Sequence, residues 1–255
     1  MHENLDDNIL SHDATLEGAL TNLKNNYPNI TGNHLDIGSG TGNLIRRMRM
    51  QYNLTSSACD YTAEFMALDD VKVDIVDLND GVLPYADNSF DLVTFTEVAE
   101  HLENYRAIVR EVHRILKPGG VIVLTTPNIL NMKSRMRFLT NGFWSMFGPL
   151  HVGETAIEST GGHITPIAYP YLAHALMNVG FDMPKLNVDK MQFPSIFWLV
   201  LFYLPIQIIG ALVWRKERNR YHTLDTHNAP IISQINSLQM LLGRCIVVSA
   251  RKTGG

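Results

Sequence analysis

The chain has 255 residues, of which 45% are hydrophobic and 18% charged, and its formal net charge at pH 7 is −4. These values are ordinary for a folded chain and predict one α/β domain with a small appendage, while the negative charge argues against nucleic acid as the general partner. Cys59 and Cys245 both lie in apolar, strand-like segments, so a disulfide framework is not indicated.

The first residues are acidic and lack the basic-then-apolar order of a secretion signal, so we expect a cytoplasmic protein. We predict a helical extension over residues 1–32, and the fold proper begins after it. The run Leu35–Gly42 places Gly38, Gly40 and Gly42 at the end of a short apolar strand. Such a loop lets a ligand approach the backbone closely, at the edge where open α/β sheets bind nucleotides.

The spacing of these glycines narrows the class of ligand. It is G-x-G-x-G, whereas the loops that support a pyrophosphate have G-x-G-x-x-G. We place Asp36 inside the turn, where a carboxylate would repel a diphosphate but attract an ammonium group. The pattern therefore favours a cationic nucleotide that bears an amino acid over NAD.

The next segments continue a nucleotide-binding half-sheet. Asp60 follows the second strand, where a carboxylate can accept both ribose hydroxyl protons, and Asp77 follows the third strand. A helix over residues 104–116 is apolar on one face and is stopped by a Lys-Pro-Gly-Gly sequence. The strands predicted after the loop lie at residues 54–59, 71–76, 89–95 and 121–125.

The second half departs from a minimal domain. Residues 128–140 and 166–179 read as helices, and 186–188 and 245–250 as the sixth and seventh strands. The irregular stretch 141–165 has the length of a lid or substrate loop, on which His151 and Glu154 are candidate substrate contacts. We therefore predict a core over residues 33–190, a helical insertion over 191–243, and a last strand and tail over 244–255.

The insertion is unusually apolar. Residues 191–214 contain no charged residue. As a helix, this segment would be long enough to cross about 30 Å of hydrocarbon. A single crossing is rejected, because the resemblance named below implies that strands six and seven are neighbours in the sheet. Pro205 and Gly210 predict a broken helix, flanked by Trp198, Trp214 and the basic run 215–220, as at a membrane interface. The alternatives are a cap over a bulky substrate and a homodimer interface.

Residues 231–242 are predicted to form one amphipathic helix that packs on the sheet.

Together these motifs resemble the class I S-adenosylmethionine-dependent methyltransferases, over about residues 33–190, and within them the type 11 subgroup that includes ubiquinone-pathway enzymes. The segments that match are 35–42, Asp60, Asp77, 89–93, 97–102 and 116–120. The resemblance implies a Rossmann-like, seven-stranded, mostly parallel sheet with helices on both faces. It also implies that S-adenosylmethionine is held by Asp36, Gly38, Ser39, Gly40, Gly42, Asp60, Tyr61, Asp77, Leu78 and Glu97.

The chemistry is expected just after the fourth strand. Glu97, Glu100 and His101 are spaced i, i+3 and i+4, so on a helical turn they would share a face. With the distant His163 they form a candidate site for Mg, Mn or Zn, and the pattern resembles metal-dependent O-methyltransferases of catechol-like rings or of the terminal ribose of small RNAs. Two alternatives stay open: His101 or His163 as a metal-free general base, and Glu97 with His101 as helix cap and cofactor contacts only.

The resemblance therefore implies methylation of a hydroxyl on an apolar or lipid-linked acceptor, such as a quinone precursor or a cell-envelope saccharide, with His101, Glu97 and His163 as catalytic candidates. No nucleic-acid partner is expected, and the insertion would lie at the inner membrane face. A second interpretation is a catalytically silent cofactor-binding subunit that docks a partner or membrane through the insertion. A third is a dehydrogenase, which Asp36 disfavours.

Overall fold

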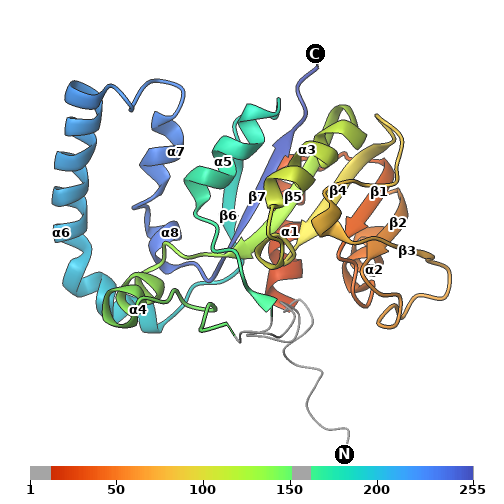
Figure 1. Ribbon diagram of the computed structural model, residues 1–255, viewed down its shortest axis with the longest axis horizontal. Coiled ribbons are helices and arrows are strands. Elements are labelled where there is room, and N and C mark those ends of the chain that lie inside the picture. The colour runs from red at the N-terminus through yellow and green to blue at the C-terminus, as the bar shows by residue number, and fades with distance from the viewer. Residues whose placement is uncertain (1–12, 151–161, 255) are drawn as a thin grey trace, which may run out of the picture.

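A seven-stranded sheet forms the centre of the protein, with strand order β3-β2-β1-β4-β5-β7-β6 (Figure 1). The computed structural model describes residues 13–150 and 162–254. Strand β7 is antiparallel to both its neighbours, and the other neighbouring strands are parallel. The strands are β1 (Gly32–Ile37), β2 (Leu54–Asp60), β3 (Val73–Ile75), β4 (Phe90–Thr96), β5 (Leu116–Pro127), β6 (Lys185–Val188) and β7 (Cys245–Arg251). The predicted mostly parallel, Rossmann-like sheet is thereby confirmed.

Helices cover both faces of this sheet, and a group of them lies beyond the β6 edge (Figure 1). The α-helices are α1 (Asp13–Asn26), α2 (Asn43–Gln51), α3 (Tyr105–Ile115), α4 (Met132–Asn141), α5 (Tyr169–Asn178), α6 (Pro194–Lys216), α7 (Ala229–Gln234) and α8 (Leu238–Leu242). Short turns are η1 (Leu78–Asp80), η2 (Ala99–His101) and the π-helical η4 (Glu217–Tyr221). Helix α1 accounts for the described part of the predicted N-terminal extension.

The alternation of side chains along the buried strands builds two core layers. In β5, Ile122 and Leu124 join the cluster under α3 and α5, whereas Val121 and Val123 join the one under α1 and α2. Because successive strand residues point to opposite faces, a continuous run of apolar residues is what a strand covered on both sides requires. This packing fixes the carboxyl edge of the sheet, on which the functional loops lie.

Truncating Leu124 to Ala is expected to destabilise the fold by about 2–5 kcal/mol, because the side chain is fully buried and its removal leaves a cavity. Urea unfolding followed by circular dichroism measures this change. The matched control is Leu139→Ala, since Leu139 is 74% exposed and its truncation should change stability by less than about 0.5 kcal/mol. Equal losses in the two variants would contradict the assignment of the core.

Some element boundaries differ from those predicted. The third strand is shorter than residues 71–76, because β3 lies at the edge of the sheet and pairs with β2 only over Val73–Ile75. The helix predicted from residue 166 begins at Tyr169, with Pro170 in its first turn, where the missing N–H costs nothing. The fifth strand includes the Lys-Pro-Gly-Gly segment, with a register irregularity between Phe90 and Leu92 of its partner.

The insertion between β6 and β7 lies where it was predicted, but its helices differ. Helix α6 is continuous through Pro205, so the predicted break is wrong. Proline removes only the local hydrogen bond to the carbonyl four residues earlier, and its ring here lies on the exposed side of the helix. The predicted single helix over 231–242 is two helices instead, because the Ser237 side chain accepts the N–H of Met240 and starts α8.

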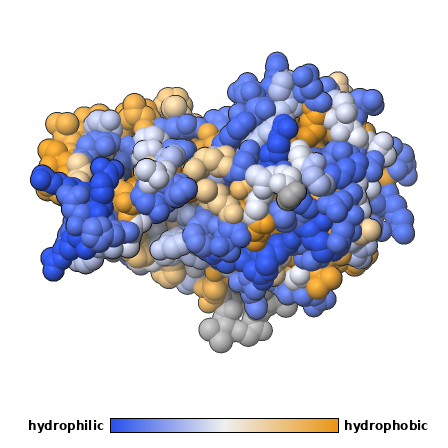
Figure 2. Space-filling model, turned by 90° about the horizontal axis from the view of Figure 1, so that it is seen from above, coloured by the Kyte–Doolittle hydropathy of each residue, from blue (hydrophilic) through white to orange (hydrophobic). Residues whose placement is uncertain are grey.

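The insertion gives the molecule an apolar end. Apolar residues gather at the end where α6 lies, next to strongly hydrophilic side chains (Figure 2). Helix α6 carries more large exposed apolar side chains than any other helix or strand of the described chain.

Candidate active site

The glycine loop connects β1 to α2 at the carboxyl edge of the sheet. Gly38, Gly40 and Gly42 have φ values of 70°, 49° and 75°, a backbone region that residues with side chains rarely adopt. At Gly38 space is limiting as well, because an added Cβ would lie 2.2 Å from Cγ2 of Val98. This loop therefore needs glycine for its backbone conformation and for its close packing.

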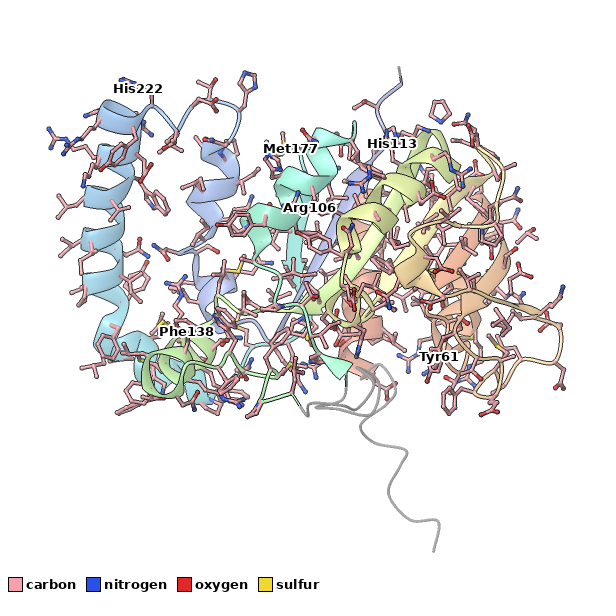
Figure 3. All side chains as sticks on the ribbon, viewed as in Figure 1. Tyr61, Arg106, His113, Phe138, Met177 and His222 are labelled. Atoms are coloured by element: carbon pink, nitrogen blue, oxygen red, sulfur yellow. The ribbon has the colours of Figure 1, made fainter. Side chains whose placement is uncertain are left out.

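Asp60, the last residue of β2, holds the loop from the neighbouring strand. Its Oδ2 accepts the N–H of Gly40 at 2.9 Å, and its Oδ1 accepts that of Tyr61 at 2.7 Å. Burial raises the pKa of this carboxyl above its ordinary value. The Tyr61 side chain is half exposed and lies at the lower edge in the view of Figure 3. Asp60 and Tyr61 thus occupy the rim of the loop, and their contact with a ribose stays a prediction.

Two further predicted cofactor residues follow β3. Asp77 is exposed, and its carboxylate accepts the N–H of Asn79 at 2.9 Å to cap η1, while Leu78 is buried. In the glycine loop, the hydroxyl of Ser39 is buried and has no hydrogen-bond partner among the described residues. A buried polar atom without a partner fits a loop that hydrogen-bonds a ligand. Contact of these residues with a cofactor stays a prediction.

Asp36 lies within β1 rather than in the turn where we had placed it, and it ends a hydrogen-bond chain across three strands. The hydroxyl of Thr94 on β4 donates to its Oδ1 at 2.6 Å. The imidazole of His34 lies 2.7 Å from that hydroxyl through Nε2 and 3.1 Å from the hydroxyl of Ser56 on β2 through Nδ1. Since the hydroxyl of Thr94 donates its hydrogen bond to Asp36, it accepts one from Nε2 of His34. Nε2 is therefore the protonated nitrogen of this imidazole.

Sequence reasoning missed this hydrogen-bond chain, because its four side chains are brought together only by strand pairing. The alternation of His34 and Asp36 on one face of β1 is the one local signal. Burial raises the pKa of Asp36 to about 7 and lowers that of His34 to about 3. A neutral histidine therefore lies beneath the carboxyl that the sequence assigned to an ammonium group.

In the wild type, the free energy of unfolding is expected to fall as pH rises toward 7 because Asp36 must ionise. Replacing Asp36 by Asn should abolish this fall. The folded-state pKa of about 7 exceeds the ordinary value of 3.8, so the native protein holds a proton that the unfolded chain releases, and its stability falls between these values as pH rises. His34 has the opposite effect but is present in both proteins. Urea unfolding measures the free energy of unfolding of both proteins at about pH 4.5 and pH 7. The value for Asp36→Asn minus that for wild type should be about 3 kcal/mol higher at pH 7 than at pH 4.5. An unchanged difference would show that Asp36 titrates normally.

A second cluster lies just after β4, at the same edge of the sheet. Glu100, His101 and His163 each offer a ligand atom, and these atoms lie within 4.8 Å of one another. The two imidazole rings are 4.8 Å apart at an interplanar angle of 72°, and Nε2 of His163 lies 4.0 Å from Oε1 of Glu100. The N–H groups of Ile164 and Thr165 donate to the carbonyl of Glu100 at 3.0 and 2.9 Å, which brings His163 to this position.

The carboxyl of Glu100 is fully buried. Its Oε2 accepts the hydroxyl of Thr126 at 3.0 Å, while Oε1 has no hydrogen-bond partner among residues 13–150 and 162–254. Burial and the neighbouring Glu97 raise the pKa of Glu100 well above its ordinary value. A buried oxygen that faces two imidazoles without a partner is a costly arrangement unless a proton or a cation satisfies it.

Both imidazoles of the cluster are neutral and oriented by backbone carbonyls. Nδ1 of His163 donates to the carbonyl of Met146 at 2.8 Å, and the ring of His101 hydrogen-bonds the backbone of Gly162. Desolvation lowers the pKa of His163, and it lowers that of His101 to about 4. A ring that donates from one nitrogen presents a lone pair on the other, which is how metal-bound histidines are held.

Glu97 does not belong to this cluster in the structure, so the predicted shared helical face is wrong. The residue has a φ of 55°, and η2 begins only at Ala99, so the i, i+3, i+4 spacing has no helix to act on. Its carboxylate accepts the hydroxyl of Thr125 at 3.1 Å and lies 3.7 Å from Sγ of Cys245. The catalytic and cofactor roles of Glu97 stay predictions.

The two candidate substrate contacts of the loop, His151 and Glu154, lie outside the described residues.

Comparisons with known proteins match part of the chain to a methyltransferase family. Residues 35–124 match the family model described as "Methyltransferase domain". Over 111 residues the chain is 30% identical to a ubiquinone/menaquinone biosynthesis C-methyltransferase of Desulfotalea psychrophila, covering 40% of this chain and 44% of that protein. A mitochondrial arginine-hydroxylase of Rattus norvegicus is 27% identical over 176 residues, 65% of this chain and 47% of that one. Residues 35–124 therefore belong to the methyltransferase-domain family.

Solved structures support the same fold over almost the whole chain. A methyltransferase from Archaeoglobus fulgidus aligns with a TM-score of 0.58 and 16% identity, covering 94% of each chain. Phosphoethanolamine N-methyltransferase 2 of Haemonchus contortus, in complex with S-adenosylmethionine, aligns with a TM-score of 0.53 and 17% identity over 93% of this chain and 53% of that one. The matches to the curated relatives above span less than half of their lengths, so activity and substrate are matters for proposal.

The methyltransferase domain offers a loop that fits this cofactor. The unpartnered hydroxyl of Ser39 and the two oxygens of Asp60 supply polar groups. The glycines allow the positive φ of the loop and, since they have no side chain, let a ligand approach its backbone. An adenosine that bears an amino acid needs such groups for its ribose and for its charged end.

Proposed function

We propose that this protein is an S-adenosylmethionine-dependent O-methyltransferase that acts on an apolar or lipid-linked acceptor. The observation that carries the choice of a hydroxyl is the buried, unpartnered Oε1 of Glu100 beside two neutral imidazoles. A hydroxyl must lose its proton as it is methylated, and this cluster is the group of titratable residues near the loop suited to that task.

The cofactor, when bound, supplies a methyl group on a sulfonium cation. The residues of this chain that would hold it are those of the glycine loop together with Asp60 and Asp77. Their task is alignment: they fix the cofactor so that the acceptor oxygen approaches in line with the S–CH₃ bond. Asp36 lies directly below the loop and supplies the carboxyl nearest to it in β1.

Glu100, His101 and His163 are suited to hold a divalent cation. Two imidazoles and one carboxylate favour Zn or Mn over Mg, which prefers oxygen ligands. An ion at this position would lower the pKa of an acceptor hydroxyl. The alternative of a metal-free base is weaker for His101, because an imidazole with a pKa of about 4 is a poor proton acceptor at neutral pH.

An exposed aromatic and aliphatic surface on α4 supports the proposal of an apolar acceptor. On α4 and the turn after it, Phe138, Leu139 and Phe143 are exposed, and Phe138 stacks on Trp144 with ring centroids 4.6 Å apart. Such a patch favours an acceptor with an aromatic ring or an isoprenoid chain, as in a quinone precursor or a lipid-carried envelope saccharide. The matched quinone-pathway relative is named a C-methyltransferase, so the methylated atom is what the test must establish.

The test combines metal analysis with methyl transfer. The protein purified without chelator is assayed for bound Zn, Mn and Mg, and then for transfer of labelled methyl to catechol-like, quinol and lipid-linked hydroxyl acceptors, before and after chelation. Bound metal together with O-methylation that chelation removes supports the proposal. Full activity with no bound ion would replace the metal by a protein base, and cofactor binding without transfer to any acceptor would favour a catalytically silent subunit.

A further inference from the structure

Helix α6 presents an apolar stripe that nothing in the described chain covers. Its side chains recur at i, i+3, i+4, i+7, i+11 and i+15, so they lie on one side of the helix along most of its length. They are 57–80% exposed: Phe197, Val200, Leu201, Leu204, Ile208 and Leu212. Contiguous exposed apolar surface on this scale marks an interaction site.

The opposite side of α6 is held by the protein, so the stripe cannot turn inward. Helices α4 and α8 pack against it. The side-chain amide of Gln207 donates to the carbonyl of Asn236 at 2.9 Å, and Ser195 is fully buried. Arg135 of α4 donates to the side chain of Asn236 and to the carbonyl of Ile235, which ties α4 and α6 to the segment between α7 and α8. The stripe therefore faces outward as a fixed feature of the fold.

The stripe is not part of a simple membrane span. Residues Pro194–Tyr221 are long and apolar enough to cross a bilayer by length and composition. However, β6 and β7 on either side of the insertion are paired strands, so the chain must return to the same side. The return begins at His222 with a φ of 55° and runs through a polar segment to α7, whose Ile231 is buried in the core. An orientation in the plane of a membrane surface satisfies both the apolar stripe and this return.

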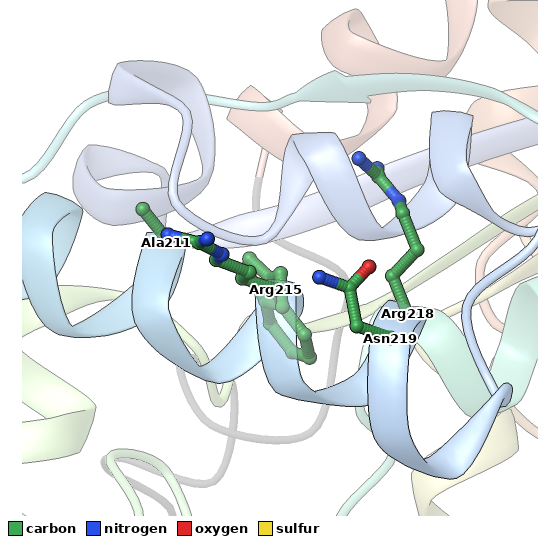
Figure 4. Close-up of a pocket in the computed structure, with 5 residues that line it drawn as sticks. Ala211, Arg215, Arg218 and Asn219 are labelled. Carbon is green, nitrogen blue, oxygen red and sulfur yellow. The ribbon is translucent and has the colours of Figure 1, made fainter.

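The C-terminal end of α6 carries the charge that such a surface would attract. Residues 215–220 contain four cations and one carboxylate. Arg215 and Arg218 line a hollow together with Trp214, Ala211 and Asn219 (Figure 4). Guanidinium groups bind phosphate oxygens through paired N–H donors, and indole rings favour the level of lipid headgroups.

The other end of α6 lies at the edge of the sheet that carries the methyltransferase site. Helix α4, which packs on α6, carries the exposed Leu139 and Phe138, and Phe138 lies near the lower end of α6 in the view of Figure 3. That end is the carboxyl edge of the sheet, where the glycine loop lies. An acceptor embedded in the same surface would thus lie at the same edge of the sheet as the glycine loop.

We propose that α6 docks this protein on an anionic phospholipid bilayer, with the apolar stripe at the acyl boundary and Arg215 and Arg218 on lipid phosphates. The interaction combines buried apolar area with attraction to anionic headgroups, the two contributions that bind helices lying in the interface. It requires no turnover, so it stands or falls independently of methyl transfer.

The test is flotation of the full chain with vesicles of phosphatidylcholine, with and without about one third phosphatidylglycerol. We expect strong binding to the anionic vesicles, weakened by salt. The double variant Val200→Glu/Leu204→Glu should lose at least about tenfold in partitioning, because two charges enter the stripe. The matched control Met50→Glu, at an exposed apolar position on α2, should bind as wild type. Arg215→Gln/Arg218→Gln should lose roughly 25-fold on anionic vesicles, at about fivefold per cation.

Titration with S-adenosylhomocysteine checks that each variant is folded and keeps its glycine loop. Equal binding of wild type and Val200→Glu/Leu204→Glu would overturn the assignment of the stripe. Failure of wild type to bind either vesicle, together with a dimer by light scattering that the same double variant abolishes, would identify the stripe as a contact between two copies of the chain. Binding to both vesicles alike would overturn the role of the two arginines.

Discussion

Gly38→Val is expected to abolish binding of S-adenosylhomocysteine, with at least about a hundredfold loss of affinity. Two effects add at this position. A β-branched residue is strained at a φ of 70°, and its Cβ would lie 2.2 Å from Cγ2 of Val98. The loop must move to relieve the contact, and with it the backbone groups that the cofactor approaches. Calorimetry of the wild type and the variant measures the loss.

Gly142→Ala separates the two effects. Gly142 ends α4 with a φ of 79°, but an added Cβ there meets nothing within 4 Å. It should cost about 1 kcal/mol of stability from backbone strain and leave cofactor affinity unchanged. Circular dichroism must show Gly38→Val folded for the comparison to hold. A folded Gly38→Val protein with wild-type affinity would disprove the role of the loop.

Glu100→Gln should lower methyl transfer by at least about a hundredfold while leaving cofactor affinity within about twofold. The amide has the size of the carboxylic acid and can still accept from Thr126, so the fold should tolerate it. It cannot provide the anionic ligand that a cation needs between His101 and His163, so bound metal should also fall to near zero. Metal analysis and single-turnover assays on the same preparation test both expectations.

The matched control is Glu103→Gln, since Glu103 lies three residues further along on an exposed turn and loses the same charge. It should retain both metal and activity. Loss of activity in Glu100→Gln with metal content unchanged would assign Glu100 to positioning the imidazoles instead. Unchanged activity and metal would remove the cluster from the chemistry.

The positions of most strands along the sequence and the place of the insertion could be predicted from local patterns. Runs of β-branched and apolar residues bounded by Gly, Pro and Asp define β1, β2, β4 and β7, and both faces of the central strands are buried as continuous apolar runs require. The length of the edge strand β3 was harder to predict, because its pairing with β2 sets that length rather than its own sequence.

The helices of the insertion were predicted less well, for physical reasons. A proline predicts a break, but in α6 the cost at Pro205 is confined to one hydrogen bond, and the helix continues. The periodicity of residues 231–242 is compatible with one helix, yet the Ser237 side chain caps a new one. Caps compete locally with helix continuation, and periodicity alone does not reveal which prevails.

In the site, the residue types were predicted better than their geometry. The pairing of His163 with Glu100 and His101 depends on backbone hydrogen bonds over some sixty residues, yet it brings three of the four predicted metal ligands together. Glu97 lies apart from the other predicted metal ligands because its backbone is left-handed. Such a conformation is hard to predict at a residue that is not glycine. The chain from Ser56 through His34 and Thr94 to Asp36 required the strand register, which no local pattern supplies.

The central claim is that the loop from Gly38 to Gly42, with Asp60, holds the adenosine of S-adenosylmethionine. A crystal of the full chain soaked with S-adenosylhomocysteine tests it most directly. The account predicts the ribose hydroxyls on the carboxylate of Asp60 and the amino-acid end over the glycine loop. A crystal in which the compound is absent from this edge of the sheet, or lies elsewhere on the protein, would contradict it.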